Sequence, residues 1–591
     1  MSLLALASIT IVCLVAGYFL YGTFIARQYR LDDKTTTPAV QRNDGVDFVP
    51  TRPFYLLGQH FSAIAAAGPI VGPITACLMF GWGPCVLWIV LGVILIGAVH
   101  DFSALVASVR HGAHSIAEIA KVHLGTRAWY ALIGFIWLAL LYVIVAFTDV
   151  TARTFQGLSE ELLSVPGAFN KGGAVAASSV IYMGLALLMG VLTRYARMST
   201  LVATIVFVPA TLGAVYFGTQ VDQVLNFGPK VWYGAILAYC FIASMLPLWL
   251  LQQPRGYLGG FVLYLAIGVG LVGVLFGGFE IRQPAWKDSG SILAFVTGGE
   301  DAPDMLALMF PFLFVTIACG ACSGFHGLIC GGTTSKQIER ESHCKPVAFG
   351  AMLLEGLVAL IALATVMIIA QGDLRGRAPG VIYGDGLAMF ITRFLDPGAL
   401  ALDDPMRSRV FVLAATFGAM AFSTFVFDTL DVSTRLGRYL LCELTGTTSR
   451  VAGGLAAALT AGIPLVVLLA PTTTGAGRPA WMMFWTLFGT ANQLLASLTL
   501  LGVTVWLYRT GRKYWYTLAP MIFVFGVTMT ALAAQILAGV RALRIDGFSP
   551  TPPVLNAIVG VALLALALVF VVEAWRSVRT HARVLASARR G

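Results

Sequence analysis

Long apolar segments recur along the whole chain and decide what it can fold into. About fifteen stretches of roughly 20 mostly apolar residues follow one another, and this is the length that an α-helix needs to cross a bilayer. The runs are too long, and alternate too little, for the strands of a membrane barrel. The segments lie near residues 3–25, 56–80, 82–107, 128–148, 174–192, 200–218, 232–252, 257–279, 305–331, 347–370, 409–430, 452–471, 480–507, 515–538 and 554–574. The sequence therefore predicts an all-α polytopic membrane protein with about fifteen transmembrane helices.

The composition excludes several other classes of protein. Of the 591 residues, 58% are apolar and 11% are charged, whereas soluble chains carry about 25% charged residues. A water-soluble enzyme, a disordered chain and a disulfide-stapled secreted domain are therefore excluded, and we expect no enzymatic activity. The apolar stretch from Leu3 to Ile25 lacks a basic leader and an Ala-x-Ala cleavage site, so we expect a retained helix and not a signal peptide.

The Lys and Arg residues are distributed unevenly between alternate loops. With fifteen segments, one set of loops and the C-terminal tail hold 25 of the 38, and the other set holds 13. Because positive loops face the cytoplasm, we expect the C-terminus inside and the N-terminus outside, with the longest outer loops at 280–304 and 371–408. The net charge of +10 then reflects topology, so we expect a lipid bilayer and not nucleic acid as the partner.

The second segment carries two Gly-Pro pairs that interrupt a helix. Gly68-Pro69 and Gly72-Pro73 lie four residues apart, and His60 precedes them in the same segment. Each proline removes an amide donor and disfavours helix at the residue before it, which exposes carbonyls and half-helix ends inside the membrane. Transporters hold substrates and ions at such discontinuous helices. The alternative interpretation is a helix that is merely kinked where it packs on a neighbour.

A second interruption is expected further along the chain, at one of two places. Pro247 lies in the middle of the seventh segment, five spans after the second, which is the relation expected of a five-plus-five inverted repeat. The ninth segment is the rival, because residues 316–327 form the densest run of small and polar residues in the chain. The candidate substrate-binding residues of this run and its continuation are Cys319, Ser323, His326, Thr333 and Thr334.

A metal site in the ninth segment is the less favoured interpretation of its cysteines. Cys319-x-x-Cys322 with His326 four residues later has the spacing of metal ligands. A zinc site needs a fourth ligand, however, and no matching Cys or His cluster occurs elsewhere in the sequence. Small residues for close helix packing explain both cysteines more simply, so we expect no metal site.

Ionisable residues inside the apolar segments are costly and therefore functional or paired. Asp431 can pair with Arg435 at i+4, whereas Asp428 has no basic neighbour at i±3 or i±4 and is the better proton carrier or cation ligand. By these boundaries no Lys or Arg lies deep in a segment. Asn492 and Gln493 either support a binding site or, as we favour, form hydrogen bonds between helices. The buried candidates are His60, His100, Asp101, His326, Glu355, Asp428 and Asp431.

Several stretches together identify a family. They are Thr37-Pro-Ala-Val with residues 42–51, residues 60–73, residues 246–250 with Pro254-Arg255 and Tyr257-Leu258, residues 310–326 with Thr333-Thr334, and residues 487–493. Residues 97–102 and Asp431 with Thr434-Arg435 fit as well. Over about residues 37–496 the chain resembles the carbon starvation protein A family of bacterial inner-membrane transporters.

The resemblance implies a secondary transporter with a leucine-transporter-like inverted-repeat core and discontinuous helices. Members of the family are associated with peptide uptake during carbon starvation and, in a close branch, with pyruvate–proton symport. It implies a multi-pass protein of the bacterial cytoplasmic (inner) membrane that uses a coupling proton or sodium ion and no other cofactor. We expect a transporter core with an N-terminal extra helix at residues 1–475 and a peripheral transmembrane bundle at residues 476–591.

We therefore predict a cation-coupled symporter that imports small carboxylated nutrients, either short peptides or pyruvate. The competing hypothesis is a membrane sensor or receptor that binds the same nutrient without transporting it. The predicted substrate-binding residues are His60, Gly68, Pro69, Gly72, Pro73, Pro247, Cys319, Ser323, His326, Thr333 and Thr334. The predicted ion-coupling residues are Asp101, Glu355, Asp428, Asp431 and Thr434. The choice between peptide and pyruvate, the choice between proton and sodium, and the oligomeric state stay open at this point.

Overall fold

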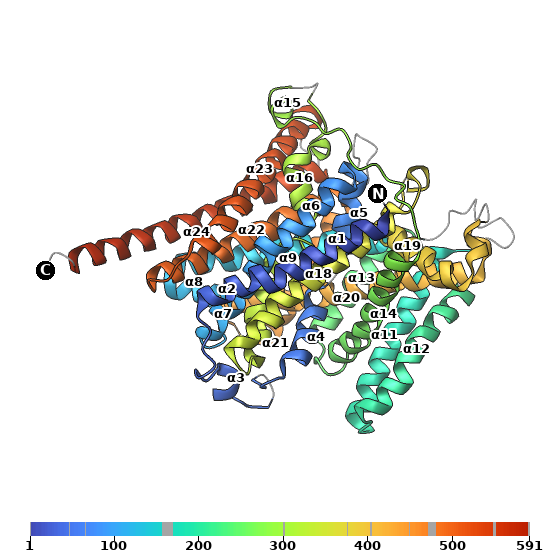
Figure 1. The fold of residues 1–591 in the computed structure, drawn as a ribbon, viewed down its shortest axis with the longest axis horizontal. Coiled ribbons are helices and arrows are strands. Elements are labelled where there is room, and N and C mark those ends of the chain that lie inside the picture. Colours follow the sequence, from blue (N-terminus) through green and yellow to red (C-terminus); the bar gives the residue numbers. More distant parts are fainter. Residues whose placement is uncertain are drawn as a thin grey trace.

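The molecule is built from helices packed side by side (Figure 1). The structure, a computed structural model, describes residues 2–45, 48–65, 67–156, 169–298, 302–374, 376–401, 405–447, 449–470, 480–547 and 551–588. Within these ranges the β-type pairings are two isolated bridges, Ser2 with Glu280 and Thr51 with Ile338. The all-α polytopic fold is thereby confirmed.

The helices divide into those before and those after residue 280. The first part holds α1 (Leu3–Ala16), η1 (Gly17–Gly22), α2 (Thr23–Tyr29), α3 (Pro38–Gln41), α4 (Pro53–Ile64), α5 (Gly68–Phe80), α6 (Trp82–Gly92), η2 (Val93–Gly97), α7 (Ala98–Arg110), α8 (Ile116–Leu124), α9 (Thr126–Thr154), α11 (Lys171–Tyr195), α12 (Thr200–Gln220), α13 (Pro229–Met245) and α14 (Gln252–Phe276). The second part holds α15 (Ile292–Thr297), η4 (Met305–Ala307), α16 (Met309–Thr316), α17 (Gly324–Gly332), η5 (Thr334–Gln337), η6 (Glu341–His343), η7 (Lys345–Gly350), α18 (Ala351–Met367), η8 (Gln371–Leu374), α19 (Pro379–Leu395), η9 (Pro397–Ala401), η10 (Pro405–Arg407), α20 (Arg409–Thr445), α21 (Arg450–Leu469), α22 (Ala480–Arg509), α23 (Trp515–Asp546) and α24 (Pro552–Ala588).

The number of membrane spans is slightly below the predicted one. Among the described residues, twelve helices are long and apolar enough to cross a membrane, and thirteen spans result if one bent pair is counted. These thirteen coincide with predicted segments, and the two segments that remain are the seventh and the ninth. Helix α13 in the seventh has only 17 residues. The ninth is split into α16 and α17, which have 8 and 9 residues. Shorter helices, and not missing ones, therefore account for the difference.

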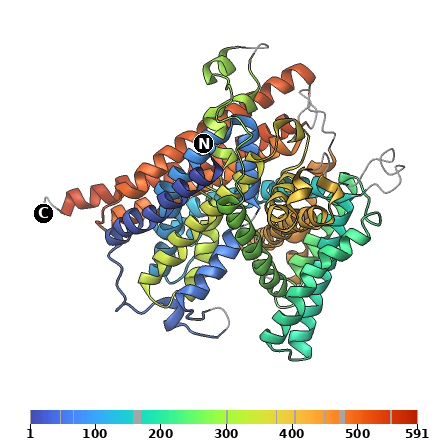
Figure 2. The same ribbon diagram turned by 45° about the vertical axis from the view of Figure 1, so that its right-hand side comes forward.

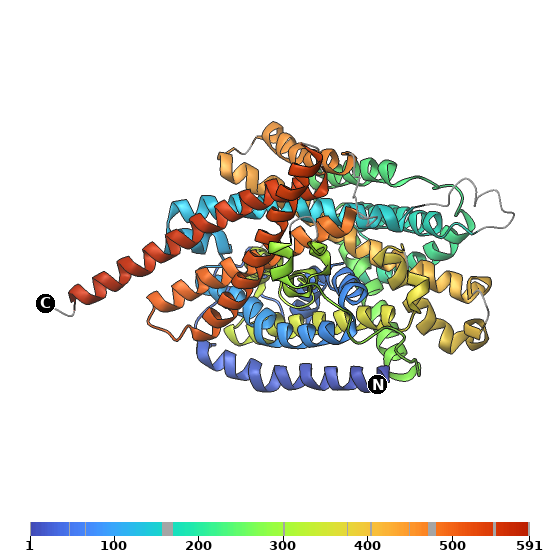
Figure 3. The same cartoon turned by 90° about the horizontal axis from the view of Figure 1, so that it is seen from above.

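The N-terminal helix lies along one edge of the bundle (Figure 3, dark blue). Ser2 caps its beginning, because the Ser2 hydroxyl accepts a hydrogen bond from the Ala5 amide at 3.3 Å. Elements α1, η1 and α2 continue one another over Leu3–Tyr29, and protein buries only 33% of the most apolar stretch. The remaining side chains of this helix therefore face the surrounding lipid.

Two helices are interrupted inside the bundle, in the second and the ninth predicted segments. Helices α4 and α5 meet at an angle of 49°. Pro69 stands in the first turn of α5, where its missing amide would have no helical partner anyway. Helix α16 ends at Thr316 and α17 begins at Gly324, with small residues between them. The predicted discontinuous helices are confirmed, and the ninth segment provides the second of them.

The prediction that Pro247 interrupts a helix is wrong. Helix α13 ends at Met245 and α14 begins at Gln252, so Pro247 lies in the exposed connection between two helices. The sequence placed residues 253–256 in a loop, but they belong to the first turn of α14. Arg255 is therefore a residue of a transmembrane helix.

Residues 371–408, which we predicted as an outer loop, contain a buried helix. Helix α19 packs antiparallel to the first half of α20, because Gly380 approaches Phe422 while Gly384 approaches Ala415. A Cβ atom on Gly384 would lie 2.8 Å from the Ala415 carbonyl oxygen, so the two backbones can come this close only at glycine. The three glycines of α19, with its charged residues, hid the helix from the hydropathy pattern.

Helix α22 lies inside the bundle, although we predicted that it begins a peripheral one. Its most apolar stretch is 94% buried, and it contacts α9, α16 and α17. The long helix α24 extends beyond the other helices at its C-terminal end (Figure 1), and α11 and α12 form a hairpin at the side of the bundle (Figure 2). The predicted domain boundary at 475/476 lies outside the described residues, so the division into two domains stays a prediction.

Candidate functional site

The two interrupted helices cross at their breaks. Gly68, the first residue of α5, touches Cys319 in the break before α17, and a Cβ atom on Gly68 would lie 2.4 Å from the Cys319 sulfur. Gly72 lies against the end of α16, where a Cβ atom would come within 2.6 Å of the Thr316 carbonyl oxygen. Helix α5 therefore begins beside the segment from which α17 begins. Each half-helix start carries the positive end of a helix dipole.

Asn492 of α22 caps the beginning of α17. Its Oδ1 accepts a hydrogen bond from the Phe325 amide at 3.0 Å. Its Nδ2 donates to the Ser323 hydroxyl at 3.0 Å and lies 3.3 Å from the Cys319 sulfur. The neighbouring Gln493 donates to a carbonyl of α16 at 2.9 Å. The expectation that these two side chains hydrogen-bond between helices is confirmed.

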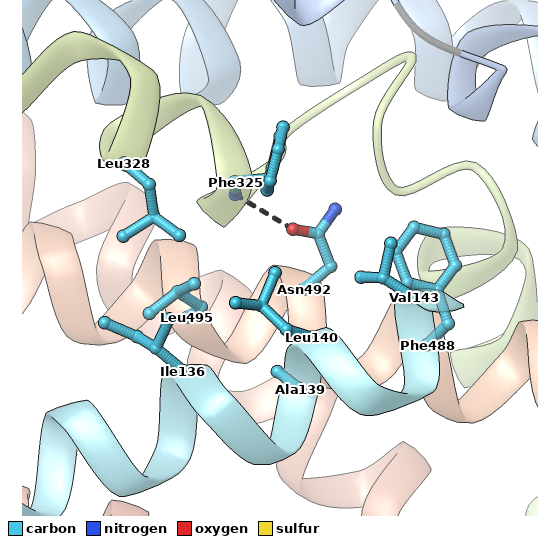
Figure 4. A pocket seen from close by; sticks show the side chains of 9 residues that line it. All are labelled: Ile136, Ala139, Leu140, Val143, Phe325, Leu328, Phe488, Asn492 and Leu495. Carbon is cyan, nitrogen blue, oxygen red and sulfur yellow. Dashed lines mark hydrogen bonds between the residues drawn. The ribbon is translucent and has the colours of Figure 1, made fainter. Parts of the chain in front are cut away.

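A small apolar pocket adjoins Asn492 between α9, α17 and α22 (Figure 4). The enclosed volume is about 10 Å³, which is the space of roughly one water molecule. Nine side chains line it: Ile136, Ala139, Leu140, Val143, Phe325, Leu328, Phe488, Asn492 and Leu495. Asn492 is the polar member of this set, and its amide group points from α22 toward the start of α17 (Figure 4). A larger occupant requires the three helices to separate.

Another face of α17 presents His326 to a buried cluster of ionisable residues. Asp101 of α7 accepts a hydrogen bond at each carboxylate oxygen, from His100 Nδ1 at 2.7 Å and from His326 Nδ1 at 2.8 Å. All three side chains are at most 1% exposed. Because each carboxylate oxygen accepts from a ring N–H, Asp101 fixes the orientation of both imidazoles.

Glu355 of α18 lies on the far side of His326. Its Oε2 is 3.2 Å from His326 Nε2, an ion-pair distance without the alignment of a hydrogen bond. Glu355 is fully buried, and neither of its oxygens has a hydrogen-bond partner among the described residues. With one proton shared through His326, the trio of Asp101, His326 and Glu355 carries a net charge of −1, and one further proton makes it neutral. Because a buried charge is costly, this arrangement is suited to bind and release one proton.

His60 extends the cluster toward the interrupted helix α4–α5. Its Nδ1 lies 2.8 Å from the Thr334 hydroxyl, and its Nε2 lies 4.0 Å from the Cys330 sulfur. The Cys330 thiol in turn donates to the Asp101 carbonyl at 3.5 Å. Cys330 was not among the predicted site residues, since a cysteine in an apolar segment gives no signal of its own. The predicted residues that the fold brings together here are His60, Asp101, His326, Thr334 and Glu355.

A second cluster surrounds Arg255, whose side chain is fully buried. Its guanidinium donates to Asp428 at 2.5 and 3.0 Å, to the Tyr239 hydroxyl at 2.6 Å, and to Asp431. Asp431 therefore pairs with Arg255 and not with Arg435, and Asp428, which has no basic neighbour at i±3 or i±4, has its basic partner on another helix. Arg435 instead donates at 2.7 Å to each of two carbonyls at the end of α13. The expectation that no Lys or Arg lies deep in a segment did not consider Arg255, which precedes the predicted segment and is buried in the first turn of α14.

The other predicted residues lie apart from the two clusters or line the crossing without a charged partner. Thr434 and Thr333 donate their hydroxyl hydrogens to carbonyls four residues earlier in the chain, at 2.8 and 3.3 Å. Pro73 is buried within α5, beside the crossing. Pro247 is exposed and far along the chain from both breaks. The role of each of these residues in binding stays a prediction.

Further buried acids lie where the hydropathy pattern gave no signal, and Asp149 and Asp385 are two of them. Asp149, 1% exposed near the end of α9, accepts hydrogen bonds from Arg153 at 3.0 Å and from a tyrosine of α13 at 2.5 Å. Asp385, 6% exposed in α19, pairs with Lys171 of α11 and with Arg377. The first stands just past a predicted segment and the second stands in the predicted outer loop, so neither was recognised as buried.

The cysteines near the crossing are free thiols. Cys322 is fully buried, and Cys319 contacts Gly68 and Asn492 as described. In the part of the chain that the structure describes, no group of three or more His, Cys, Asp or Glu side chains is arranged to hold a metal ion. The buried cluster thus offers proton-binding groups joined by imidazole bridges.

Two solved structures align with most of the chain. One is MhsT in complex with L-phenylalanine, with a TM-score of 0.43 and 13% identity over 86% of this chain and 98% of that one. The other is the manganese transporter of Eremococcus coleocola, with a TM-score of 0.45 and 11% identity over 90% of this chain and 97% of that one. The leucine-transporter-like inverted repeat continues to rest on the sequence resemblance.

Curated relatives match over most of their lengths. The peptide transporter CstA of Bacillus subtilis is 32% identical, covering 95% of each chain. The peptide transporter CstA of Escherichia coli is 31% identical over 88% of this chain and 79% of that one. The pyruvate/proton symporter BtsT of Escherichia coli is 30% identical over 89% and 80%. These names support a membrane transporter. The family model described as carbon starvation protein CstA matches residues 2–392 and 399–531, so the chain belongs to the carbon starvation protein CstA family.

Proposed function

We propose that the protein is a proton-coupled symporter that carries small carboxylates such as pyruvate into the cell. The proposal rests on the observation that α17 contributes residues both to the apolar pocket and to the buried cluster. Phe325 and Leu328 form one wall of the apolar pocket, while His326 joins Asp101 and Glu355 in the buried cluster. A movement of α17 that opens the pocket must also move an imidazole between two acids. Binding of substrate and binding of a proton are therefore coupled through one element.

The coupling ion is a proton in this proposal because of the donor set. Imidazole and carboxyl groups in contact pass protons directly, whereas a sodium ion needs several oxygen ligands around it. Glu355 has no hydrogen-bond partner among the described residues, so its carboxyl can accept a proton without breaking another bond. Proton relays of Asp, Glu and His are the usual meaning of such groups inside a membrane. Asp101 then orients His326 and shares the proton.

The substrate is a small carboxylate because of the pocket and the half-helix ends beside it. The positive dipole ends at the starts of α5 and α17 attract a carboxylate. The nine lining side chains include no carboxylate that would pair with the α-ammonium group of a peptide. The enclosed space of about 10 Å³ also has to expand less to hold a molecule of a few carbon atoms, such as pyruvate, than to hold a peptide. The name of the relative BtsT, a pyruvate/proton symporter, agrees with this choice.

The test is uptake into proteoliposomes that contain the purified protein. Labelled pyruvate is supplied outside at a pH one unit below that of the lumen, with a protonophore added to a parallel sample. For one proton per monocarboxylate, a gradient of one pH unit supports about tenfold accumulation. Glu355→Gln should abolish accumulation yet retain exchange of pyruvate at equal pH. Glu118→Gln, at a half-exposed acid of α8, is the matched control and should accumulate like the wild type.

Three outcomes would contradict the proposal in different ways. Accumulation driven by a sodium gradient and not by the pH gradient would refute the proton as coupling ion. Inhibition by dialanine or trialanine as strong as that by unlabelled pyruvate would refute the choice of substrate. Saturable binding of pyruvate without any flux would favour the sensor or receptor hypothesis.

A further inference from the structure

A second cavity lies on the outer side of the bundle, between the N-terminal helix and α18. Its volume is about 290 Å³, close to the lower end of the range of ligand-binding pockets. It is lined by Ile11, Leu14, Val15, Tyr18, Phe19, Leu57, Pro346, Gly350, Leu353, Leu354 and Leu357. We call it the lateral groove. Because the lining residues are apolar or aromatic, the groove suits a hydrocarbon chain. It shares no lining residue with the pocket at Asn492.

Irregular helix geometry shapes the groove on both sides. The N-terminal helix is π-helical over Gly17–Gly22, and the entry to α18 is π-helical over Lys345–Gly350. The two π-helical stretches touch, since a Cβ atom on Gly22 would lie 2.9 Å from the Phe349 ring. Gly350 leaves the floor open, because a Cβ atom there would meet its nearest neighbours, Tyr18 and Leu57, only at 3.6 and 3.9 Å. Wider turns of this kind are frequent at functional sites.

One end of the groove carries a lysine without a counter-ion. Lys345 Nζ donates to the Thr23 hydroxyl at 2.8 Å and lies 4.4 Å from the centre of the Tyr18 ring. No carboxylate of the described residues lies within 4.0 Å of this ammonium group, unlike that of Lys171, which pairs with Asp385. Exposed Arg27 follows Thr23 by one helical turn and adds positive charge on that face.

We propose that the lateral groove binds an anionic phospholipid, with an acyl chain between the N-terminal helix and α18 and the headgroup phosphate on Lys345. The lipid supplies the negative charge that the described residues do not place within 4.0 Å of this lysine. Basic pockets between transmembrane helices bind anionic headgroups in this way. The bound lipid fastens the lightly buried N-terminal helix to α18, which carries Glu355 of the buried cluster.

The experiment uses the full chain, purified and delipidated in detergent. Dioleoylphosphatidylglycerol and dioleoylphosphatidylcholine have the same acyl chains and differ in headgroup charge, and inorganic phosphate tests the headgroup without a chain. Bound lipid is counted by native mass spectrometry, and the unfolding temperature is recorded with each probe. Phosphatidylglycerol should remain bound and raise the unfolding temperature of the wild type more than phosphatidylcholine does. Inorganic phosphate should have no effect.

Two variants separate the charge from the groove. Lys345→Gln should weaken binding of phosphatidylglycerol about fivefold, the contribution of one lysine near an anionic headgroup, and weaken that of phosphatidylcholine less, because the choline ammonium already neutralises its phosphate. Lys345→Arg should restore binding, and Lys513→Gln at an exposed lysine should not change it. Gly350→Leu fills the groove and should weaken both lipids, whereas Gly350→Ala should bind like the wild type.

The proposal fails in any of three cases. If Lys345→Gln and the wild type bound phosphatidylglycerol equally well, the proposed contact between Lys345 and the headgroup would be refuted. If inorganic phosphate stabilised the protein as much as the lipid does, the proposed binding of an acyl chain in the groove would be refuted. Undiminished lipid binding by a folded Gly350→Leu protein would place the lipid elsewhere on the bundle.

Discussion

Arg255 is a cation without access to water, and two acids of α20 share it. Asp431 is deeply buried, whereas the Asp428 side chain is 27% exposed, so one of the two partners depends on the guanidinium more than the other. Removing one partner of a buried ion pair leaves an uncompensated charge and costs about 3–5 kcal/mol. The cluster fastens α14 to α20 and, through Tyr239, to α13.

Replacing this arginine should therefore weaken the fold. Arg255→Gln is expected to lower the free energy of unfolding by about 3 kcal/mol or more, because Asp431 remains buried without a cation. Asp428→Asn should cost less, since that side chain is only partly buried. Thermal unfolding in detergent measures both, with Arg450→Gln at an exposed arginine as the control. An Arg255→Gln protein that unfolds at the wild-type temperature would contradict the structural role of the cluster.

The residues of the buried cluster differ in how visible they are in the sequence. His60, Asp101, His326 and Glu355 stand out because an ionisable side chain inside an apolar segment is costly and needs a reason to be there. Their assembly does not follow from the sequence, since it depends on how four helices pack. Arg255 was missed for a simpler reason: the predicted segment began at 257, and five residues decide whether a charge lies in a loop or in a membrane.

Helix α8 is joined to α7 by a pair of histidines. His111 Nε2 and His123 Nε2 lie 2.8 Å apart, and His111 Nδ1 donates to the Ala107 carbonyl at 2.7 Å. With both rings neutral, His111 accepts the hydrogen bond that His123 donates. Arg509 of α22 and Ser577 of α24 each donate to the His123 carbonyl at 2.7 Å, so the pair also connects these two helices.

This histidine pair makes stability depend on pH. Burial, together with His111 and Arg509, lowers the pKa of His123 from 6.5 to about 4, and burial also lowers the pKa of His111. Between these values the unfolded chain binds more protons than the folded one, so stability falls as pH decreases from about 6.5 to about 4. The unfolding temperature should decline over this window. His123→Gln, which keeps a donor for His111, should flatten the profile.

A matched variant checks the assignment. His114 lies in the same connection, but its side chain is 48% exposed. His114→Gln should follow the wild-type pH profile. A profile that stays steep in His123→Gln and flattens in His114→Gln would show that the pair is not the group responsible.

Elements were predictable where apolar length alone defines them. Helices such as α9 and α20 follow from their hydropathy, because lipid and protein both accept apolar faces. Helix α19 was missed because its glycines and charges are typical of a loop, and their purpose is visible only against α20 and Lys171. The break in the ninth segment was recognised as one of two candidates, and only the contact with Gly68 decides between them.

The molecule as a whole spans the membrane many times, and its orientation stays a prediction from the loop charges. Helix α19 bears on that prediction, because a further full crossing would invert every loop after it. It packs antiparallel on the first half of α20, so its end lies near the beginning of α20. Its start, at Gly380, lies beside Phe422 and so reaches no further than the middle of α20. We therefore expect α19 to enter the bundle without crossing the membrane.

Single cysteines at exposed positions test this topology. Gly372→Cys and Gly398→Cys, one on each side of α19, should both react with a membrane-impermeant maleimide in intact cells. Lys513→Cys, between α22 and α23, should react only after the cells are permeabilised. Labelling is compared with the unsubstituted protein, because it has nine free thiols of its own. Protection of Gly398→Cys in intact cells would mean that α19 crosses and that the predicted orientation fails beyond it.

Phe325 and His326 are consecutive residues of one helix, and this adjacency has a consequence for energy conservation. A helix turn is stiff, so α17 cannot yield on its pocket side while it stays still on its acid side. In a carrier built this way, the substrate and the proton can be released only together. In the proton-coupled symporter proposed above, the geometry of this single turn would suppress ion slip, the futile passage of protons without nutrient. Under that proposal, a cell with little carbon would keep its proton-motive force when there is nothing to import.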